Sequence, residues 1–407
     1  MTGAHPELVL EGISVVELAG DPAGEMLGKV LAEMGAEVVK VEPPDGSPSR
    51  ALGPWAAGVE DREHSLTFWY YNVNKRSVVI DYSTPEGHAD LDRLCRSADV
   101  FITTLHPVQR RELGIDYDSL RAGAPHLVVV SITPFGLDGP WSDRLSSDLV
   151  GLALGNPLNS CGYDDHTIPP IRPGGDQGYQ SAASFALMGL MLALVERQGT
   201  GEGQLIDVGM HDCLAVNAEL SNPYWFYPKA LVHRQTCRHA QPTPTQPALF
   251  QCGDDRWLYF VMFVADPKQW DVVLDWLDTK ELAVDLRDEA FEDAAYRQAH
   301  FDHIQEVVEV FFMLQTAEEA YHDGQARGLP IGPINSPDDL FHDEHLLARE
   351  FFVPVEHDDV PPALYPGPPC RFSRYGAAAM TRAPKLGEHT DAVLGQHQVG
   401  GRQQGGS

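Results

Sequence analysis

Residues 13–42 read ISVVELAGDPAGEMLGKVLAEMGAEVVKVE, and this stretch decides the fold. Two short apolar runs, at 13–19 and 36–42, flank a segment at 22–34 whose apolar residues recur with helical spacing. Pro22 stands at the first helical position, where the missing N–H costs nothing. The pattern predicts a strand, a helix and a second strand parallel to the first.

The same alternation continues through the next hundred residues or so. Further strands are predicted at 77–82, 99–104 and 126–133, with a helix at 84–98 that Thr84 caps. Apolar strands that alternate with helices predict an α/β fold with a Rossmann-like, doubly wound parallel sheet. Such a sheet binds ligands beyond the carboxyl ends of its strands. The glycines after the first strand lack G-x-G-x-x-G spacing, so dinucleotide binding is not predicted.

The second half of the chain changes character. Between about 222 and 247 the composition shifts to Pro, Tyr, Thr, His and Arg, which predicts an extended linker or binding loop. The other elements predicted here are a long helix at 179–197, strands at 205–210 and 257–263, and helices at 211–220, 267–277, 303–314 and 316–327.

Composition limits the classes of partner. Lys and Arg total 29 against 59 Asp and Glu, a net charge of −30, which argues against nucleic acid. The six cysteines are scattered without a C-x-x-C pair, as in a cytoplasmic protein with reduced thiols and no metal site. No signal peptide is predicted at the start of the sequence. The uninterrupted apolar run at 185–195 is too short to span a membrane, so a buried core helix is predicted there.

One carboxylate stands in front of the long helix. Residues 173–182 read PGGDQGYQSA, with Asp176 among three glycines at the expected helix start. The N–H groups and the positive dipole end of a helix stabilise a carboxylate at this place. Asp176 is therefore either a helix cap or a nucleophile, and the residues themselves leave both open.

Several stretches together indicate a family. They are LEGISVVELAGDPAGEMLGKVLAEMGAEVVKVEPP, YNVNKRSVVIDYSTPEG, SADVFITTLHP, LVVVSITPFGLDGPW, LVERQGTGEGQLIDVGMHD, GLPIGPINSPDDLFHDEHLLAREFF and APKLGEHTDAVL. From about Leu10 to Leu394 the chain resembles the family III CoA-transferases, the CaiB/BaiF group.

The resemblance implies an organisation and an activity. Such proteins have a large Rossmann-like domain, a smaller α+β domain and a C-terminal segment that returns to the large domain, and two chains interlock as a dimer. They move CoA from an acyl-CoA donor to a carboxylic acid acceptor, with no metal and no tightly bound cofactor. The predicted boundaries are 1–222 for the N-terminal part of the large domain, 223–340 for linker and small domain, 341–395 for the returning segment and 396–407 for a disordered tail.

The resemblance also implies where CoA lies. By charge, Lys75 and Arg76 are the expected partners of its phosphates. The positions that match the CoA-contacting segments are Ala23, Asn72, Val73, Asn74, Lys75, Thr104, Leu105, His106, Thr133, Pro134 and Phe135.

The nucleophile is the point at which the sequence departs from the family. There, one aspartate forms an anhydride and then a thioester with CoA, and Asp176 is the candidate. Counted back without gaps from GTGEGQ, however, that aspartate falls at Gly178 or Tyr179. The alternative is therefore a non-catalytic, CoA-binding subunit of a hetero-oligomer. A 2-methylacyl-CoA racemase is less well supported, because Ser147 stands where its catalytic histidine would be.

Overall fold

The computed structural model describes residues 8–217, 221–262 and 266–400, with side chains as far as residue 395. These residues form two compact units, each with its own core. The first contains 8–157, 173–217 and 344–400, and the second contains 158–172 and the described part of 219–343. Residues 158–172, which the predicted boundaries assign to the large domain, thus cluster with the second unit.

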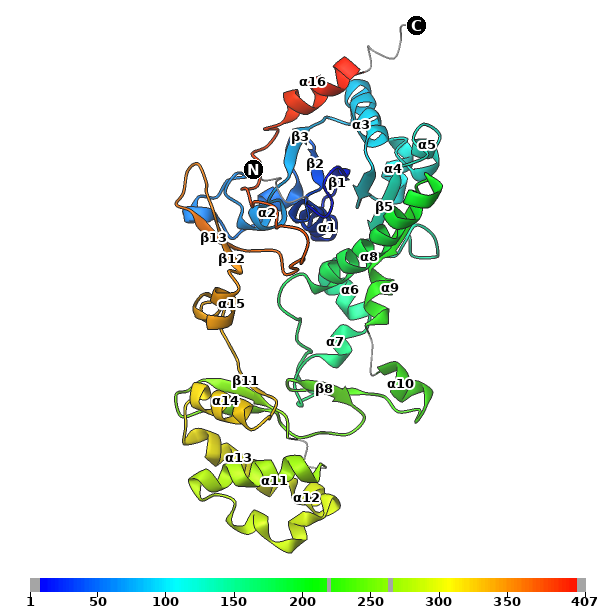
Figure 1. Cartoon of the computed structure of the whole chain (residues 1–407). Helices are drawn as coiled ribbons and strands as arrows, with labels where there is room; N and C mark the ends of the chain where they lie inside the picture. Colours follow the sequence, from blue (N-terminus) through cyan, green and yellow to red (C-terminus); the bar gives the residue numbers. More distant parts are fainter. Residues whose placement is uncertain (1–7, 218–220, 263–265, 401–407) are drawn as a thin grey trace. The chain divides into compact units, whose positions relative to one another are not determined.

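A parallel sheet of six strands forms the centre of the first unit (Figure 1). Its order is β3-β2-β1-β4-β5-β6, the order of a doubly wound sheet, and it confirms the predicted α/β class. The strands are β1 (Ser14–Leu18), β2 (Glu37–Glu42), β3 (Arg76–Val79), β4 (Val100–Thr103), β5 (Val128–Thr133) and β6 (Leu205–Gly209). The order in which strands are added to the sheet reverses between β1 and β4, and sheets of this class bind ligands at that point.

Several helices of the first unit lie beside this sheet, among them α1, α3 and α8 (Figure 1). The helices of this unit are α1 (Pro22–Glu33), α2 (Leu66–Tyr71), α3 (Pro85–Ser97), α4 (Pro107–Glu112), α5 (Tyr117–Arg121), α6 (Asp148–Leu154), α8 (Gln177–Thr200), α9 (Met210–Val216), α15 (Glu344–Ala348) and α16 (Thr390–Gly400). The short helix α7 (Pro157–Ser160) stands at the boundary between the units. Thr84 caps α3 as predicted, because its side chain accepts the N–H of Gly87 at 3.1 Å.

Helix α1 rests on buried charges. Lys40 Nζ donates to Glu17 at 2.9 Å and to Glu25 at 2.8 Å, and none of these side chains is exposed to solvent. Buried charges need such partners, since desolvation would otherwise outweigh any gain. The network therefore fixes α1 to β1 and β2, and with it the position of the first turn of α1.

The C-terminal segment joins the first unit at the edge strand β3. The N–H of His389 donates to Ser77 O at 3.0 Å, and the N–H of Val79 donates to Thr390 Oγ1 at 3.0 Å. The segment also holds the antiparallel pair β12 (Phe352–Val355) and β13 (Ala363–Pro366). Helix α16 continues to Gly400 and so enters the stretch predicted to be disordered, while 401–407 lie outside the described residues.

The second unit packs helices on a small antiparallel sheet (Figure 1). The predicted linker instead holds a short helix and a hairpin, α10, β7 and β8. Thr316 and Glu319 form a capping box at the start of α14. The elements are α10 (Ser221–Phe226), β7 (His233–Gln235), β8 (Arg238–Gln241), β9 (Leu249–Gln251), β10 (Trp257–Phe260), α11 (Pro267–Leu277), α12 (Ala294–Ala299), α13 (Phe301–Met313), α14 (Ala317–Ala326) and β11 (Ile331–Pro333).

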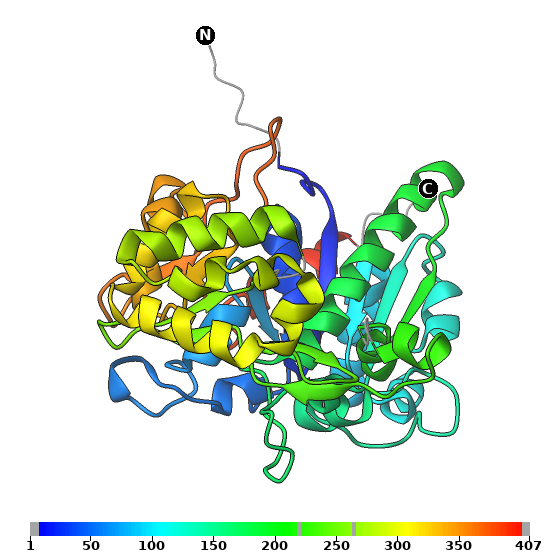
Figure 2. The same ribbon diagram turned by 90° about the horizontal axis from the view of Figure 1, so that it is seen from below.

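Helix α8 is longer than the helix predicted at 179–197. Within the described residues it is a candidate membrane span by length and composition, with mean hydropathy 1.4, although the apolar run was expected to be too short. It nevertheless packs against α1, α9 and the sheet (Figure 2), and Ala186 and Leu190 are among its buried residues. These contacts are those of a core helix.

Candidate active site

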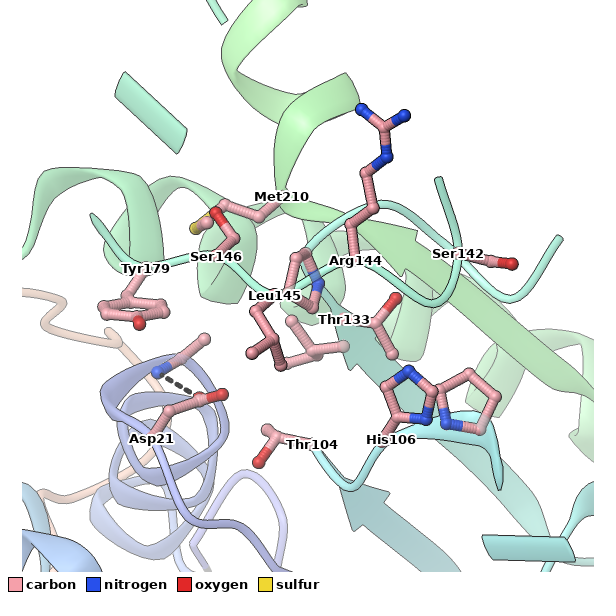
Figure 3. Close-up of a pocket in the computed structure, with 14 residues that line it drawn as sticks. Asp21, Thr104, His106, Thr133, Ser142, Arg144, Leu145, Ser146, Tyr179 and Met210 are labelled. Atoms are coloured by element: carbon pink, nitrogen blue, oxygen red, sulfur yellow. Dashed lines mark hydrogen bonds between the residues drawn. The ribbon is translucent and has the colours of Figure 1, made fainter. Parts of the chain in front are cut away.

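A cavity of about 160 Å³ opens at the carboxyl ends of β1, β4 and β5, where the strand order reverses (Figure 3). Its walls come from the start of α1, the turn after β4, the end of β5, the loop at 142–146, the first turn of α8 and the start of α9. The lining residues are Asp21, Ala23, Thr104, His106, Pro107, Ile132, Thr133, Pro134, Ser142, Arg144, Leu145, Ser146, Tyr179 and Met210.

Five of the predicted CoA contacts meet in this cavity, from segments far apart in the sequence. They are Ala23, Thr104, His106, Thr133 and Pro134. Two other predicted CoA contacts, Leu105 and Phe135, do not line the cavity. Leu105 packs against the core beneath the sheet. Phe135 contacts the rings of Trp141 and His211, with its centroid 5.6 Å and 5.8 Å from theirs.

The segment Asn72–Lys75 does not line the cavity as described. Asn72 and Val73 are buried. Asn74 Oδ1 accepts the N–H of Thr381 at 2.6 Å, so it is held by the returning C-terminal segment. This stretch therefore joins parts of the first unit to one another.

Lys75 was expected at a phosphate, and the structure corrects that expectation. Its Nζ donates to Glu17 Oε2 at 2.7 Å, to Asn72 Oδ1 at 2.9 Å and to the carbonyl of Glu25 at 2.8 Å, and the residue is 4% exposed. Burial lowers its pKa to about 8. The sequence showed a basic pair, but it could not show that the Lys75 side chain points into the buried charge network. Arg76, the other expected phosphate partner, pairs with Glu37.

Thr133 lines the cavity and carries a buried hydroxyl. The residue is 4% exposed, and its Oγ1 has no hydrogen-bond partner among the described residues. A buried hydroxyl without a partner costs on the order of 1–3 kcal/mol, so such an atom is usually reserved for a ligand or water. Thr133 can therefore donate a hydrogen bond to a carbonyl oxygen bound in the cavity.

Asp21 is the carboxylate that faces the cavity (Figure 3). Its Oδ1 accepts the N–H of Ala23 at 3.0 Å and of Gly24 at 3.3 Å, which caps α1. Burial raises the pKa of Asp21 to about 7, against the lowering effect of these N–H groups. A Cβ on Gly24 would lie 2.7 Å from Thr104 Cγ2, so glycine lets this helix start approach the turn after β4 closely.

Tyr179 stands opposite Asp21, on the first turn of α8 (Figure 3). Burial, together with the carboxyl groups of Asp21, Asp148 and Asp176, raises its pKa to about 12. Its hydroxyl thus stays protonated at neutral pH and can donate a hydrogen bond. By the ungapped count, this tyrosine or Gly178 stands where the family aspartate was expected.

Asp176, the predicted nucleophile, is not among the described residues that line this cavity. Its Oδ2 accepts the hydroxyl of Tyr71 at 3.2 Å. Its side chain makes no capping bond to α8, so the helix-cap alternative is not realised. Asp148 caps α8 instead, because its Oδ1 accepts the N–H of Gly178 at 2.7 Å.

Two further predictions concerned Ser147 and a metal site. Ser147, where a racemase would carry histidine, caps α6 by accepting the N–H of Val150. Among the described residues, no group of three or more His, Cys, Asp or Glu is arranged to hold a metal ion.

Sequence reasoning missed Asp21, Tyr179 and Asp148. A signal for Asp21 was present, since an Asp-Pro pair directly after a strand predicts a capped helix start at the ligand-binding edge of the sheet. Asp148 carried no such signal, because its partner Gly178 is thirty residues away in the sequence.

Known proteins resemble this chain along nearly its whole length. The chain is 29% identical over 385 residues, covering 93% of it and 92% of the relative, to the succinyl-CoA:(R)-benzylsuccinate CoA-transferase subunit BbsE of Thauera aromatica. It is 30% identical over 399 residues to the succinate–glutarate CoA-transferase of Agrobacterium fabrum, with 95% of each chain covered. A CaiB/BaiF family protein from Brucella suis has a crystal structure that matches with a TM-score of 0.82 at 27% identity, covering 96% of this chain and 99% of that one. Residues 10–390 match CoA-transferase family III, and the chain belongs to that family.

Proposed function

We propose that this chain transfers CoA between carboxylic acids in the cavity at the ends of β1, β4 and β5. The observation that carries the proposal is the convergence of five predicted CoA contacts, from three strand ends, on one cavity. A volume of about 160 Å³ is small beside the 300–1,000 Å³ of typical ligand pockets. It suits the acyl thioester, with the nucleotide end of CoA outside.

The phosphate partner must then be sought at the rim of the cavity rather than at Lys75. Arg144 is the one arginine among the described lining residues, and it is exposed. Its guanidinium lies 4.9 Å from the centroid of the Trp141 ring. Such stacking orients the planar donor fork while leaving it free to bind an anion. We therefore assign the CoA phosphates to the side of the cavity formed by the loop at 142–146.

Succinyl-CoA is the proposed donor, because the two relatives carry succinyl-CoA or succinate in their names. The test is exchange of labelled succinate into succinyl-CoA, which needs only one acid. Thr133→Val should weaken succinyl-CoA binding or slow exchange about tenfold, since a good hydrogen bond in a buried site is worth ~1.5 kcal/mol. If neither exchange nor binding occurs, the proposal fails.

A matched control lies on the same strand. Ser131 is also buried, and its Oγ also has no hydrogen-bond partner among the described residues, but it does not line the cavity. Ser131→Ala should therefore leave both binding and exchange as they are. An equal loss in both variants would show that the effect comes from strand β5 and not from the cavity.

A second candidate function is a non-catalytic CoA-binding subunit. It is favoured by Gly178 or Tyr179 at the place expected for an aspartate, and by a relative whose name describes a subunit. This candidate expects the purified chain to bind succinyl-CoA but to catalyse no exchange.

We also propose that two copies of the chain associate, as the family resemblance implies, in the cytoplasm. Helix α8 exposes apolar side chains, with Met188 53%, Leu192 72% and Val195 66% exposed. Exposed apolar side chains gathered on one helix are typical of protein interfaces. Light scattering after gel filtration should give twice the mass of 44.8 kDa. A monomer would reject this assembly.

A further inference from the structure

Leu145 is the large apolar side chain most exposed to solvent among the described residues, at 90%. It also lines the cavity, together with its neighbours Arg144 and Ser146. A single exposed leucine on an ordinary surface needs no explanation, but this one stands at the wall of the cavity proposed to bind the acyl thioester. Its side chain therefore offers apolar surface that a bound acyl group can remove from water.

The backbone on both sides of Leu145 is held in place. The N–H of Arg144 donates to the carbonyl of Trp141 at 2.9 Å, which closes a turn directly before it. Ser147, two residues after it, caps α6 by accepting the N–H of Val150 at 3.4 Å. These two bonds keep Leu145 at the cavity, although most of its side chain is uncovered.

The same cavity has an apolar wall that is already packed. Three apolar residues form it, each at most 2% exposed: Ala23, Ile132 and Met210. Figure 3 shows Leu145 between Tyr179 and Thr133, and the hydroxyl of Thr133 is the group that can bind the carbonyl oxygen of the thioester. An acyl chain that runs from Thr133 towards Tyr179 passes Leu145, and its methylene groups then have apolar neighbours in the packed wall and in Leu145.

We propose that Leu145 is a specificity-determining residue that packs on the methylene groups of the acyl chain. This inference rests on the proposed function and names the class of acyl group that the site takes. That class is a chain with at least two methylene groups, as in a succinyl group, in preference to an acetyl group. Each methylene group that leaves water strengthens binding about fourfold, so two of them give at most roughly fifteenfold.

The experiment measures the binding of acetyl-CoA and butyryl-CoA to the full-length chain by titration calorimetry. The two thioesters share the whole of CoA, differ by two methylene groups and carry no second carboxylate. We expect the wild type to bind butyryl-CoA about tenfold more tightly than acetyl-CoA. Leu145→Ala should reduce this ratio to about threefold or less, because the chain then has apolar neighbours on one side only. Leu145→Met should keep the ratio within about twofold, since methionine preserves the apolar volume.

A matched control stands on the helix that follows the loop. Leu149 on α6 is 48% exposed, but it is not among the described residues that line the cavity. Leu149→Ala removes the same atoms as Leu145→Ala from a neighbouring exposed position. It should leave the affinities for both thioesters unchanged.

The outcomes separate this inference from the proposed function. An unchanged ratio in Leu145→Ala, or a wild type that binds the two thioesters equally or binds neither, overturns the role of Leu145 while CoA transfer stands. Weaker binding of both thioesters by the same factor in Leu145→Ala assigns the residue to the CoA arm and also overturns it. An equal fall of the ratio in Leu149→Ala overturns it too, because the effect then does not come from the cavity. No binding of succinyl-CoA by the wild type rejects the proposed function itself.

Discussion

Two helices of the first unit, α1 and α8, pack against each other and begin beside the same cavity, each behind an aspartate. Asp21 caps its own helix and faces the cavity. Asp176 does not cap α8 and turns to Tyr71, while Asp148 supplies the cap from another helix. The same sequence signal, an acid before a helix, therefore has two outcomes. The difference lies in which side chain accepts the first free N–H groups of each helix. For α1 it is the aspartate directly before the helix, and for α8 it is Asp148.

The largest effect is expected from the buried charges beneath α1. Lys40→Met would leave Glu17 and Glu25 without their shared cation inside the core. Breaking a buried ion pair on one side costs about 3–5 kcal/mol of the free energy of unfolding. Urea denaturation should show that loss, together with loss of succinate exchange as the start of α1 shifts.

A surface lysine provides the control for this prediction. Lys385 pairs with Asp358 at 3.0 Å, but both side chains are about half exposed. Lys385→Met should leave the free energy of unfolding almost unchanged, because solvent screens an exposed ion pair. Similar losses in the two variants would mean that the buried network does not anchor α1.

The next effect concerns the pH dependence of stability at Asp21. Burial raises its pKa from 3.8 to about 7 in the folded protein, so the folded state holds a proton that the unfolded chain releases near pH 4. Stability is therefore lost as the pH rises from about 4 to about 7. At pH 8 the ionised group costs at most about 4 kcal/mol, from ~1.4 kcal/mol per pKa unit.

Asp21→Asn tests that sign directly. The variant should match the wild type in the free energy of unfolding near pH 4 and exceed it at pH 8, as measured by denaturation at both pH values. A variant that is less stable than the wild type at pH 8 would contradict a desolvated carboxylate at this helix start.

The contrast between the two helix starts also shows what the sequence could and could not predict. The parallel sheet followed from the alternation of apolar runs with helical spacing, because that pattern is local. The same was true of the cap at Thr84, whose partner Gly87 is three residues away. The role of Lys75 depends on Glu17, which is far away in the chain. The start of α8 is likewise capped by the distant Asp148 and not by the side chain of Asp176. Such long-range pairs leave no mark in a single sequence, and for this reason the cavity differs from the predicted site most where they occur.

A smaller effect is expected from the cap of α8. Asp148→Ala would remove the acceptor of the Gly178 N–H, at a cost of about 1–2 kcal/mol in the free energy of unfolding. Exchange should also fall, since Tyr179 follows directly on the loosened turn. Asp148→Asn keeps an acceptor oxygen and should recover most of the stability. If the alanine variant is as stable as the wild type, Asp148 does not hold the start of α8.

The smallest effect tests the α8 side of the comparison most sharply. Tyr71→Phe removes the hydroxyl that donates to Asp176 Oδ2 at 3.2 Å and leaves the buried ring in place. The free energy of unfolding should fall by about 1 kcal/mol or less, as for a single hydrogen bond. Succinate exchange should stay within about twofold, because Asp176 is not among the described residues that line the cavity. A nucleophilic Asp176 would respond differently, because the lost donor would change its basicity and its orientation, and exchange would then change tenfold or more.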